Sequence, residues 1–157
     1  MKSIRKKNPV ELINEYASRI RLEERVVKEF VSAYLVIANL RRFNIKHVFV
    51  ENYTNERGGQ TYANFCFFGD GFYAEASNPK EVANEEQRDL FVVSLKEGLA
   101  KVNITNYSDF DFRRANDKSQ VTIAFNLRNG ESFFLNATGI NCDVLLEIYH
   151  GFLMPLF

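Results

Sequence analysis

Residues 120–136 read QVTIAFNLRNGESFFLN and carry the clearest structural signal in this chain of 157 residues. Apolar side chains alternate with polar or small ones from residue 121 to residue 127, which is the period of a half-buried strand. The Asn129-Gly130 pair that follows is the preferred sequence for a type I′ turn, after which the chain returns as a second strand. A two-residue turn would place Phe125 opposite Phe134. The segment therefore predicts an antiparallel hairpin.

Upstream of this hairpin, the same two-residue period recurs over most of the chain after residue 44. Gly69-Asp70-Gly71 links two of the apolar stretches as a second hairpin. Two further stretches, 89–95 and 99–105, are expected to pair with each other. Strands that follow one another without intervening helices indicate an antiparallel sheet, here of about seven strands. The expected strands cover residues 45–53, 61–68, 72–76, 89–95, 99–105, 108–113, 120–127 and 131–136, with a long loop over residues 77–87.

The first 44 residues follow a helical period instead. Asn8-Pro9 is a typical helix start, since Asn caps a first turn and Pro suits the first helical position. No Gly or Pro interrupts residues 10–43, and a continuous helix of that length would extend about 50 Å. Such a helix either bends near the polar residues 21–25 or packs partly on a partner. The candidate interface consists of apolar residues spaced seven apart, which are Ile13, Ile20, Val27 and Tyr34.

A closing helix is expected over residues 141–153, where apolar residues recur on one helical stripe. The element order is therefore one long amphipathic helix, an antiparallel sheet and a C-terminal helix, which predicts an α+β fold. The length suits a single domain spanning residues 1–157. Within it, residues 1–44 form a helical segment, and residues 45–157 form the sheet with its C-terminal helix.

The composition is that of a globular protein and excludes several classes. The 20 basic and 20 acidic residues balance, so the sequence does not favour a nucleic-acid-binding protein. The apolar fraction of 46% argues against disorder. Polar residues follow the basic N-terminus, so no signal peptide is expected, and residues 26–40 are too short and too charged to cross a membrane. We expect a cytoplasmic protein without a transmembrane segment.

The residues that could carry chemistry are few. Neither Cys66 nor Cys142 lies in a metal-binding or redox spacing, so both are expected to be buried thiols. No spacing typical of a metal or cofactor site occurs, and no cofactor is expected. His47 lies in an expected strand, and Asp109 and Asp111 share one face of another strand because side chains alternate. These three residues are the candidates for polar groups in a pocket.

Short basic clusters lie near the N-terminus and at the end of the long helix. Clusters of this kind allow contact with an anionic surface. A solvated tail, and a helix C-terminus stabilised by positive charge, would explain most of them. The residues concerned are Lys6, Lys7, Arg41 and Arg42.

Residues 61–153 resemble the bacterial PH-like family in element order and patterning. The resembling segments are FCFFGDGFY (65–73), FVVSL (91–95), VTIAFNLRNGESFFL (121–135) and DVLLEIY (143–149). The resemblance implies about seven antiparallel strands forming a sheet or barrel, with a C-terminal helix that covers one opening. The long N-terminal helix departs from that pattern. It resembles instead the NTF2-like cone, in which a curved sheet wraps a first helix, and neither resemblance assigns a functional residue.

The function expected from these patterns is that of a non-catalytic binding or assembly module. A long apolar stripe and many aromatic residues occur without a convergent catalytic set, which favours protein contacts or a homodimer over an enzyme. The alternative is an NTF2-like small-molecule-binding protein or enzyme with an aromatic-lined pocket. A further alternative, compatible with the small size, is an immunity or mobile-element partner protein.

Overall fold

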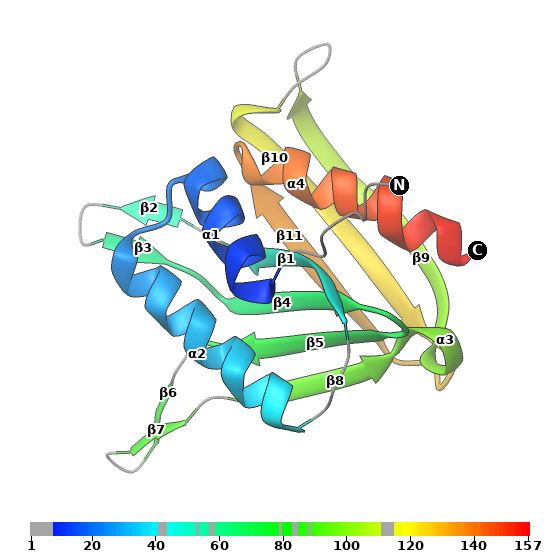
Figure 1. The fold of residues 1–157 in the computed structure, drawn as a ribbon. Coiled ribbons are helices and arrows are strands. Elements are labelled where there is room, and N and C mark those ends of the chain that lie inside the picture. The colour runs from blue at the N-terminus through cyan, green and yellow to red at the C-terminus, as the bar shows by residue number, and fades with distance from the viewer. Residues whose placement is uncertain are drawn as a thin grey trace, which may run out of the picture.

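The computed structural model describes residues 8–40, 44–52, 54–56, 59–78, 80–82, 85–87, 89–110 and 115–157. The helices are α1 (Pro9–Ile20), α2 (Glu24–Leu40), the single turn α3 (Leu95–Gly98) and α4 (Asn141–Ile148), which continues as a π-helical turn (Tyr149–Leu153) and a 3-10 turn (Met154–Leu156). The strands are β1 (Ile45–Glu51), β2 (Thr54–Glu56), β3 (Gly59–Thr61), β4 (Asn64–Gly69), β5 (Phe72–Ser77), β6 (Lys80–Val82), β7 (Glu85–Gln87), β8 (Leu90–Ser94), β9 (Leu99–Phe110), β10 (Ala115–Leu127) and β11 (Ser132–Thr138). Figure 1 shows their arrangement.

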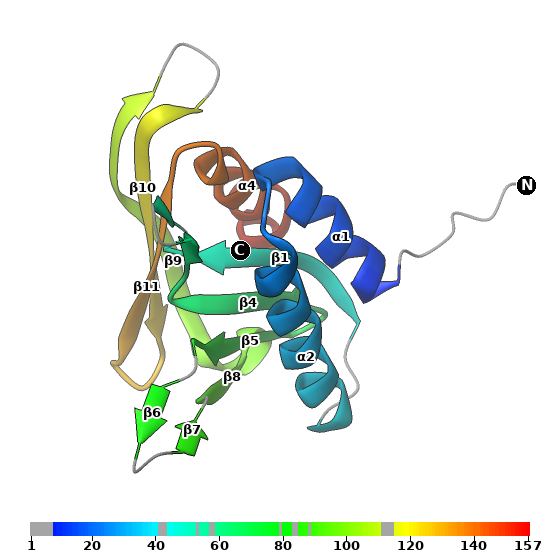
Figure 2. The ribbon, with the colours of Figure 1, turned by 90° about the vertical axis from the view of Figure 1, so that its left-hand side faces the viewer.

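Seven of these strands form two antiparallel sheets. The first sheet has the order β1-β4-β5-β8, the second sheet has the order β11-β10-β9, and β2–β3 and β6–β7 are separate short hairpins. Figure 2 shows three layers, in which α1 and α2 cover one face of the first sheet and the second sheet lies against its other face. α4 packs on β10, β11 and β1, so it bridges the two sheets. The expected α+β fold is confirmed, and neither sheet closes on itself.

The long N-terminal helix is divided into two helices, because the chain turns between α1 and α2. Arg21 adopts the left-handed conformation, with φ of 59° and ψ of 53°, and this ends α1. The side chain of Gln60 holds the turn: its Nε2 donates to the Arg21 carbonyl at 2.7 Å, and its Oε1 accepts from Glu23 N at 2.5 Å. The break lies at the start of the polar stretch 21–25, where a bend was one of two alternatives.

The expected hairpin forms from β10 and β11, but its register differs from the expected one. Leu127 N donates to the Glu131 carbonyl at 2.8 Å, which leaves a three-residue loop ending in Gly130. Gly130 has φ of 91°, a conformation that glycine adopts without strain. Phe125 consequently lies opposite Phe133 and not Phe134. Because a shift of one residue exchanges the faces of a strand, Phe133 points into the core and Phe134 to solvent.

Residues 89–95 and 99–105 do not pair as predicted, because they belong to different sheets. β8 is the last strand of the first sheet, and β9 is an edge strand of the second. The single turn α3 lies between them and redirects the chain, with the Ser94 hydroxyl accepting from Glu97 N at 3.2 Å. β9 also continues through residue 110, so residues 108–110 of the strand predicted separately at 108–113 belong to it, and residues 111–113 lie outside the described residues. β6 and β7 occupy much of the loop predicted at 77–87.

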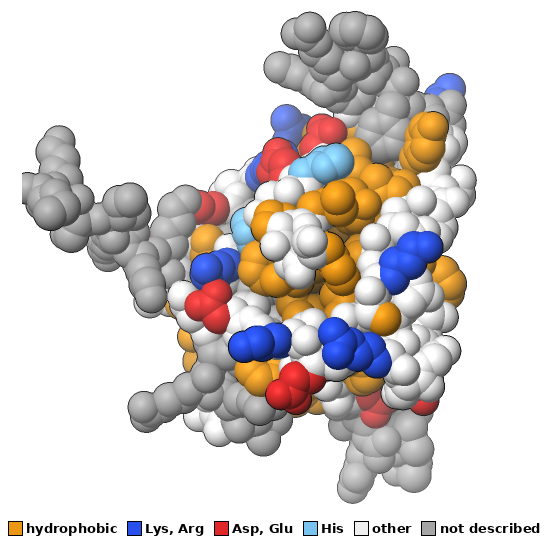
Figure 3. All heavy atoms as spheres, turned by 90° about the vertical axis from the view of Figure 1, so that its right-hand side faces the viewer, with side chains coloured by type: hydrophobic (Ala, Val, Ile, Leu, Met, Phe, Trp, Pro, Cys, Tyr) orange, Lys and Arg blue, Asp and Glu red, His pale blue; other side chains and the backbone are white. Residues whose placement is uncertain are grey.

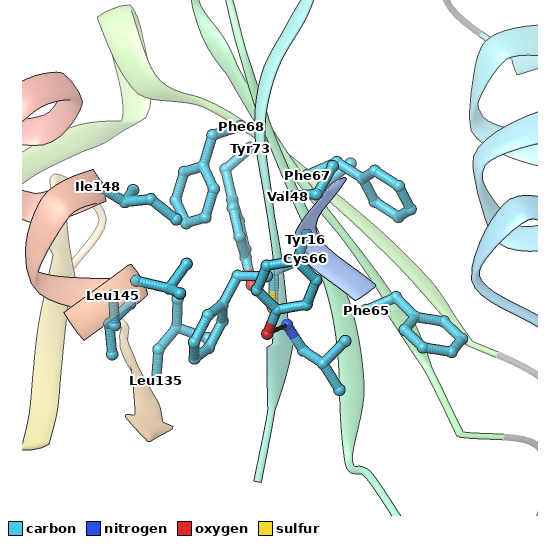
Figure 4. Packing of buried hydrophobic residues seen from close by; sticks show 14 of the residues in the cluster. Tyr16, Val48, Phe65, Cys66, Phe67, Phe68, Tyr73, Leu135, Leu145 and Ile148 are labelled. Atoms are coloured by element: carbon cyan, nitrogen blue, oxygen red, sulfur yellow. Dashed lines mark hydrogen bonds between the residues drawn. The ribbon is translucent and has the colours of Figure 1, made fainter. Parts of the chain in front are cut away.

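The core lies on both faces of the first sheet, as Figure 4 shows. On the helix side, Phe30 of α2 stacks on Phe65 with ring centroids 4.4 Å apart. On the other side, Tyr73 stacks on Phe133 at 5.3 Å, and Phe133 stacks on Phe125 at 4.6 Å. Stacked aromatic pairs add to the stabilisation from their buried area. Many of the aromatic side chains therefore serve packing.

The β1 edge of the first sheet is covered by side chains of two helices. The Tyr16 hydroxyl of α1 accepts a hydrogen bond from Val50 N at 2.9 Å and donates to Asn141 Oδ1 at 2.5 Å. Asn141, the first residue of α4, donates from Nδ2 to the Val50 carbonyl at 2.7 Å. Two side chains therefore satisfy the backbone groups that a further strand would otherwise pair with.

Candidate functional site

The β8 edge of the first sheet has no comparable cover among the residues that the structure describes. β8 pairs with β5 on one side, and it is the terminal strand in the sheet order. Its sequence, LFVVS, contains no charge, and Phe91 and Val92 are 41% and 39% exposed. Natural proteins usually protect such edges with Lys, Pro, a bulge or a covering segment. An apolar edge strand without these features is suited to pairing with another strand.

The helix-facing side of β8 borders a groove formed with α2. The groove has a volume of about 190 Å³, and its lining residues are Ser32, Ala33, Val36, Ala76, Asp89 and Leu90. Leu35 and Val36 add exposed apolar area on the same helix. We call β8 together with this groove the β8 edge site.

The two exposed side chains of β8 lie on opposite faces of the sheet. Val92 lies opposite Ala74 and so shares the helix-facing side, because cross-strand partners point to the same face. Phe91 lies on the side of the second sheet, where its ring meets Phe133 edge-on with centroids 5.7 Å apart. A strand added at this edge would find apolar contacts on both of its faces.

A buried carboxylate joins the two sheets at the opposite corner. Glu51 is 5% exposed, and its two oxygens accept from Asn64 Nδ2 at 2.7 Å and from Asn136 N at 3.0 Å. Asn52 N donates to the Asn136 carbonyl at 3.3 Å, so β1 and β11 are linked here by main chain as well. Burial raises the pKa of Glu51 to about 7, and these hydrogen bonds partly oppose the rise. We call Glu51, Asn52, Asn64 and Asn136 the seam.

Further titratable groups lie beside the seam, between the two sheets. The Tyr73 hydroxyl donates to Glu75 at 2.5 Å and lies 3.2 Å from the Cys66 sulfur. Burial raises the pKa of all three groups, most strongly for the thiol and the phenol, and the nearby carboxylates raise the pKa of Cys66 further. A thiol held protonated is a poor nucleophile. The expectation of buried thiols is confirmed for Cys66 and Cys142, which are both free and buried.

His47 lines a different pocket, between α1, β1 and α4. The pocket has a volume of about 220 Å³, and a two-pronged ion pair between Arg19 and Glu147, with N–O distances of 2.6 and 2.7 Å, forms part of its wall. Burial and the neighbouring Lys46 cation lower the pKa of His47. The His47 ring also contacts Phe152, with centroids 5.4 Å apart. The histidine is therefore a half-buried packing group at the rim of a small pocket.

The other predicted pocket and surface residues lie mainly outside the part of the chain that the structure describes. Asp109 falls in β9, but its side chain is not described. Asp111 and the four basic residues lie outside the described residues, namely Lys6, Lys7, Arg41 and Arg42. The expectation that His47, Asp109 and Asp111 supply polar groups to one pocket therefore stays a prediction.

The candidate helix interface divides into two parts. Ile13 and Ile20 are buried in the core against the first sheet, so no partner reaches them in this fold. Val27 and Tyr34 are half-buried and pack on the same core. The seven-residue spacing therefore arises from the face that α1 and α2 present to the sheet.

Sequence reasoning missed Glu51 and Glu75, although a signal for both was present. Each lies in an apolar strand, on the same face as a core residue. Glu51 comes two residues after Phe49 and Glu75 two residues after Tyr73, and side chains two residues apart in a strand share one face. A charged residue at an inward position of a strand is unusual unless it is paired or hydrogen-bonded. Their spacing of two residues from a core side chain distinguishes them from charged residues on the solvent-facing side of a strand.

The exposed apolar side chains form one more cluster, at the C-terminal turns. Met154, Leu156 and Phe157 are all exposed. Figure 3 shows hydrophobic side chains gathered in the middle of this face, with Lys and Arg side chains around them. This face is a second place, besides β8, where apolar area meets solvent.

Comparison with known proteins does not assign this chain to a family. Within the described residues, no three His, Cys, Asp or Glu side chains are placed to hold a metal ion. No described helix is both long and apolar enough to span a membrane. Protein-family models, curated proteins and solved structures yield no match to this chain.

Proposed function

We propose that this protein is a non-catalytic protein-binding module whose β8 edge accepts an extended segment of a partner protein. The observation that carries the proposal is the uncharged, half-exposed edge strand β8 beside an apolar groove. Strand addition supplies affinity through main-chain hydrogen bonds and specificity through alternate side chains. The matching partner segment is extended, with apolar side chains on both faces at its centre.

The PH-like fold forms part of this proposal. The resemblance implies about seven antiparallel strands followed by a C-terminal helix. The two larger sheets hold seven antiparallel strands, and α4, which follows them in the chain, packs on both sheets, which supports this part of the proposal. The two N-terminal helices are an addition that covers the outer side of the first sheet. An immunity or mobile-element partner protein would use the same edge, with a toxin or phage component as the added strand.

A small-molecule site between the sheets has less support. Tyr73, Phe125 and Phe133 stack on one another in that space. Because these rings fill the space between the sheets, they leave little room there for the deep cavity that an NTF2-like pocket requires. The pocket at His47 is small and is lined by both charged and apolar side chains, and we assign no reaction to it.

The experiment is selection from a displayed library of random 12-residue peptides on the full-length protein, followed by amide NMR with the selected peptides. We expect enrichment of peptides with β-branched or aromatic residues in alternation, and shifts in the amide signals of residues 90–94. Val92→Lys should weaken binding about tenfold or more, since it places a charge in an apolar strand contact. Tyr107→Lys, an equivalent change at an exposed residue of β9, should bind as the parent does.

Peptide binding that perturbs other residues, or that Val92→Lys leaves unchanged, would overturn the proposal. Failure to enrich any peptide would do the same. Self-association through β8, seen by light scattering as a dimer that Val92→Lys converts to a monomer, would replace the partner segment with a second copy of the chain.

A further inference from the structure

The outward face of the second sheet spans β11, β10 and β9 and takes no part in the proposed strand addition at β8. Figure 2 shows that α1, α2 and α4 lie on the other side of this sheet, so none of these three helices covers the face. Strand pairing arranges its side chains in four rows of three across β9, β10 and β11. The rows are Lys101-Asn126-Ser132, Asn103-Ala124-Phe134, Asn106-Thr122-Asn136 and Ser108-Gln120-Thr138.

The twelve side chains in these rows are almost free of charge, and exposed Lys118 lies beyond the last row on β10. Lys101 is the one ionised side chain among the twelve, whereas charged residues make up 25% of the whole chain. Nine of the others are amides or hydroxyls, each of which both donates and accepts hydrogen bonds. The solvent side of a strand usually includes charged residues, so this row pattern departs from an ordinary solvated surface.

One aromatic ring lies among these polar side chains. Phe134 is 52% exposed, and its cross-strand partner Ala124 is 4% exposed and carries no polar group. Asn103 stands across from Ala124 on β9, and Asn136 lies two residues along β11. The face therefore presents a half-exposed apolar ring with amide groups on two sides.

Hydrogen bonds within the face restrain some of its polar groups. The Thr122 hydroxyl donates to Asn136 Oδ1 at 2.7 Å, and Asn126 Nδ2 donates to Asn103 Oδ1 at 3.5 Å. The backbone N–H of Asn136 donates a hydrogen bond to Glu51 in the seam, which restrains β11 at this position. Groups ordered before binding lose less conformational entropy when a ligand binds.

These properties select one class of ligand. Nucleic acids and acidic or basic peptides require a surface of opposite charge, which the face lacks. A lipid surface requires a continuous apolar area, whereas one ring stands alone here. A neutral sugar offers hydroxyl groups that bond to amides and an apolar C–H side that stacks on an aromatic ring.

We propose that the outward face of the second sheet binds a neutral oligosaccharide, with one pyranose ring stacked on Phe134. Asn103, Asn106 and Asn126 bond to its hydroxyl groups. Strands about 4.8 Å apart, and side chains about 6.8 Å apart along each strand, give a spacing that a chain of several sugar units can follow. This site is separate from β8, which belongs to the other sheet, and it does not depend on the proposed strand addition.

The test is titration of the full-length protein with neutral hexasaccharides of glucose, mannose and N-acetylglucosamine, followed by amide NMR and calorimetry. We expect at least one to bind with a Kd in the range of about 0.1–5 mM and to shift amide signals of β9, β10 and β11. Hexagalacturonate, which is charged at every unit, should bind at least about tenfold more weakly to an uncharged face.

Two variants and one control make the result specific. Phe134→Ala should weaken binding about tenfold through loss of the stacking platform, and Asn106→Asp should weaken it without changing side-chain size. Phe157→Ala removes an exposed aromatic ring at the C-terminal turns and should leave sugar binding unchanged. Both test positions are on the surface, and circular dichroism should show that the variants remain folded.

Three results would overturn the proposal. The first is absence of binding by all neutral hexasaccharides at about 10 mM. The second is binding that shifts other amides or survives Phe134→Ala. The third is a dimer, seen by light scattering, that Phe134→Ala dissociates, because the face would then pack on a second copy of the chain.

Discussion

At the scale of single residues, Glu51 shows two effects acting on one carboxyl group. Its hydrogen bonds from Asn64 and Asn136 N favour the charged form, and burial between the sheets favours the neutral form. Burial is the larger effect, and the pKa of about 7 lies above the ordinary 4.5. Between about pH 4.5 and pH 7, the folded protein therefore keeps a proton on Glu51 that the unfolded chain has already released.

The first prediction is that stability falls between pH 5 and pH 8. Because the folded pKa is raised, the Glu51 contribution to stability is complete below pH 4.5 and is lost as the pH rises through 7. The free energy of unfolding in urea should decrease by about 2 kcal/mol over that range. Glu75, whose pKa burial also raises, acts in the same direction.

Two variants separate Glu51 from other causes of pH dependence. Glu51→Gln should reduce the decrease to the part due to Glu75, since an amide does not titrate. Glu131→Gln, at an exposed position beside the hairpin loop, should retain the full decrease. Equal pH dependence in Glu51→Gln and the parent protein would contradict the assignment.

The second prediction concerns Tyr16, whose hydroxyl covers the β1 edge. Tyr16→Phe removes the acceptor for Val50 N and the donor for Asn141 Oδ1, leaving two buried polar groups without those partners. We expect the free energy of unfolding to fall by about 2–3 kcal/mol and the Val50 amide to exchange faster. Tyr107→Phe, at an exposed tyrosine, is the matched control and should change stability little. Unchanged exchange at Val50 would show that the hydroxyl is not its partner.

At the scale of elements, the turn between α1 and α2 decides how the helices cover the sheet. Arg21 takes a left-handed conformation that residues with a Cβ adopt at a cost, and Gln60 from β3 bonds the backbone on both sides of it. The turn therefore depends on a contact between segments almost forty positions apart. It lets both helices lie on one face, where a straight helix would extend beyond the sheet.

The third prediction follows from that strain. Arg21→Gly should raise the free energy of unfolding by about 1 kcal/mol, because glycine adopts a positive φ without the Cβ clash and the Gln60 bonds go to backbone atoms. Ser18→Gly, at an exposed position within α1, should lower stability by roughly 0.5 kcal/mol. Thermal and urea unfolding of both variants provide the measurement. A loss of stability in Arg21→Gly would mean that the Arg21 side chain contributes more than its backbone costs.

At the scale of the whole molecule, the helices and sheets contribute to one hydrophobic core. α1 and α2 cover the face of the first sheet that carries Phe65 and Phe67, and α4 bridges the sheets through contacts with β1, β10 and β11. The seam and the α3 corner link the two sheets at separate places. Removing any layer exposes the aromatic core of its neighbour.

The fourth prediction is that a chain lacking residues 1–40 does not fold. Without α1 and α2, Phe65 and Phe67 lose the contacts that bury them, and the unsupported sheet should lose its near-ultraviolet tyrosine signal and its urea transition. The full-length Val92→Lys variant should keep both. A truncated chain that unfolds cooperatively would show that the sheet is stable alone. It would then favour the alternative in which the N-terminal helices pack on a partner protein.

The sequence by itself determined most of the helices and longer strands, and hence the α+β class, but it did not predict β6, β7 or α3. The alternation of apolar and polar residues in β10 and the helix start at Asn8-Pro9 depend only on residues close together in the chain, so the sequence alone reveals them. The tertiary structure alone decided that β8 and β9 part into different sheets, that β8 is left at an edge, and that Glu51 lies at the seam. It also placed nearly uncharged rows side by side across three strands. The physical reason is that periodicity determines which face a side chain takes, whereas the identity of its neighbours depends on contacts between distant segments.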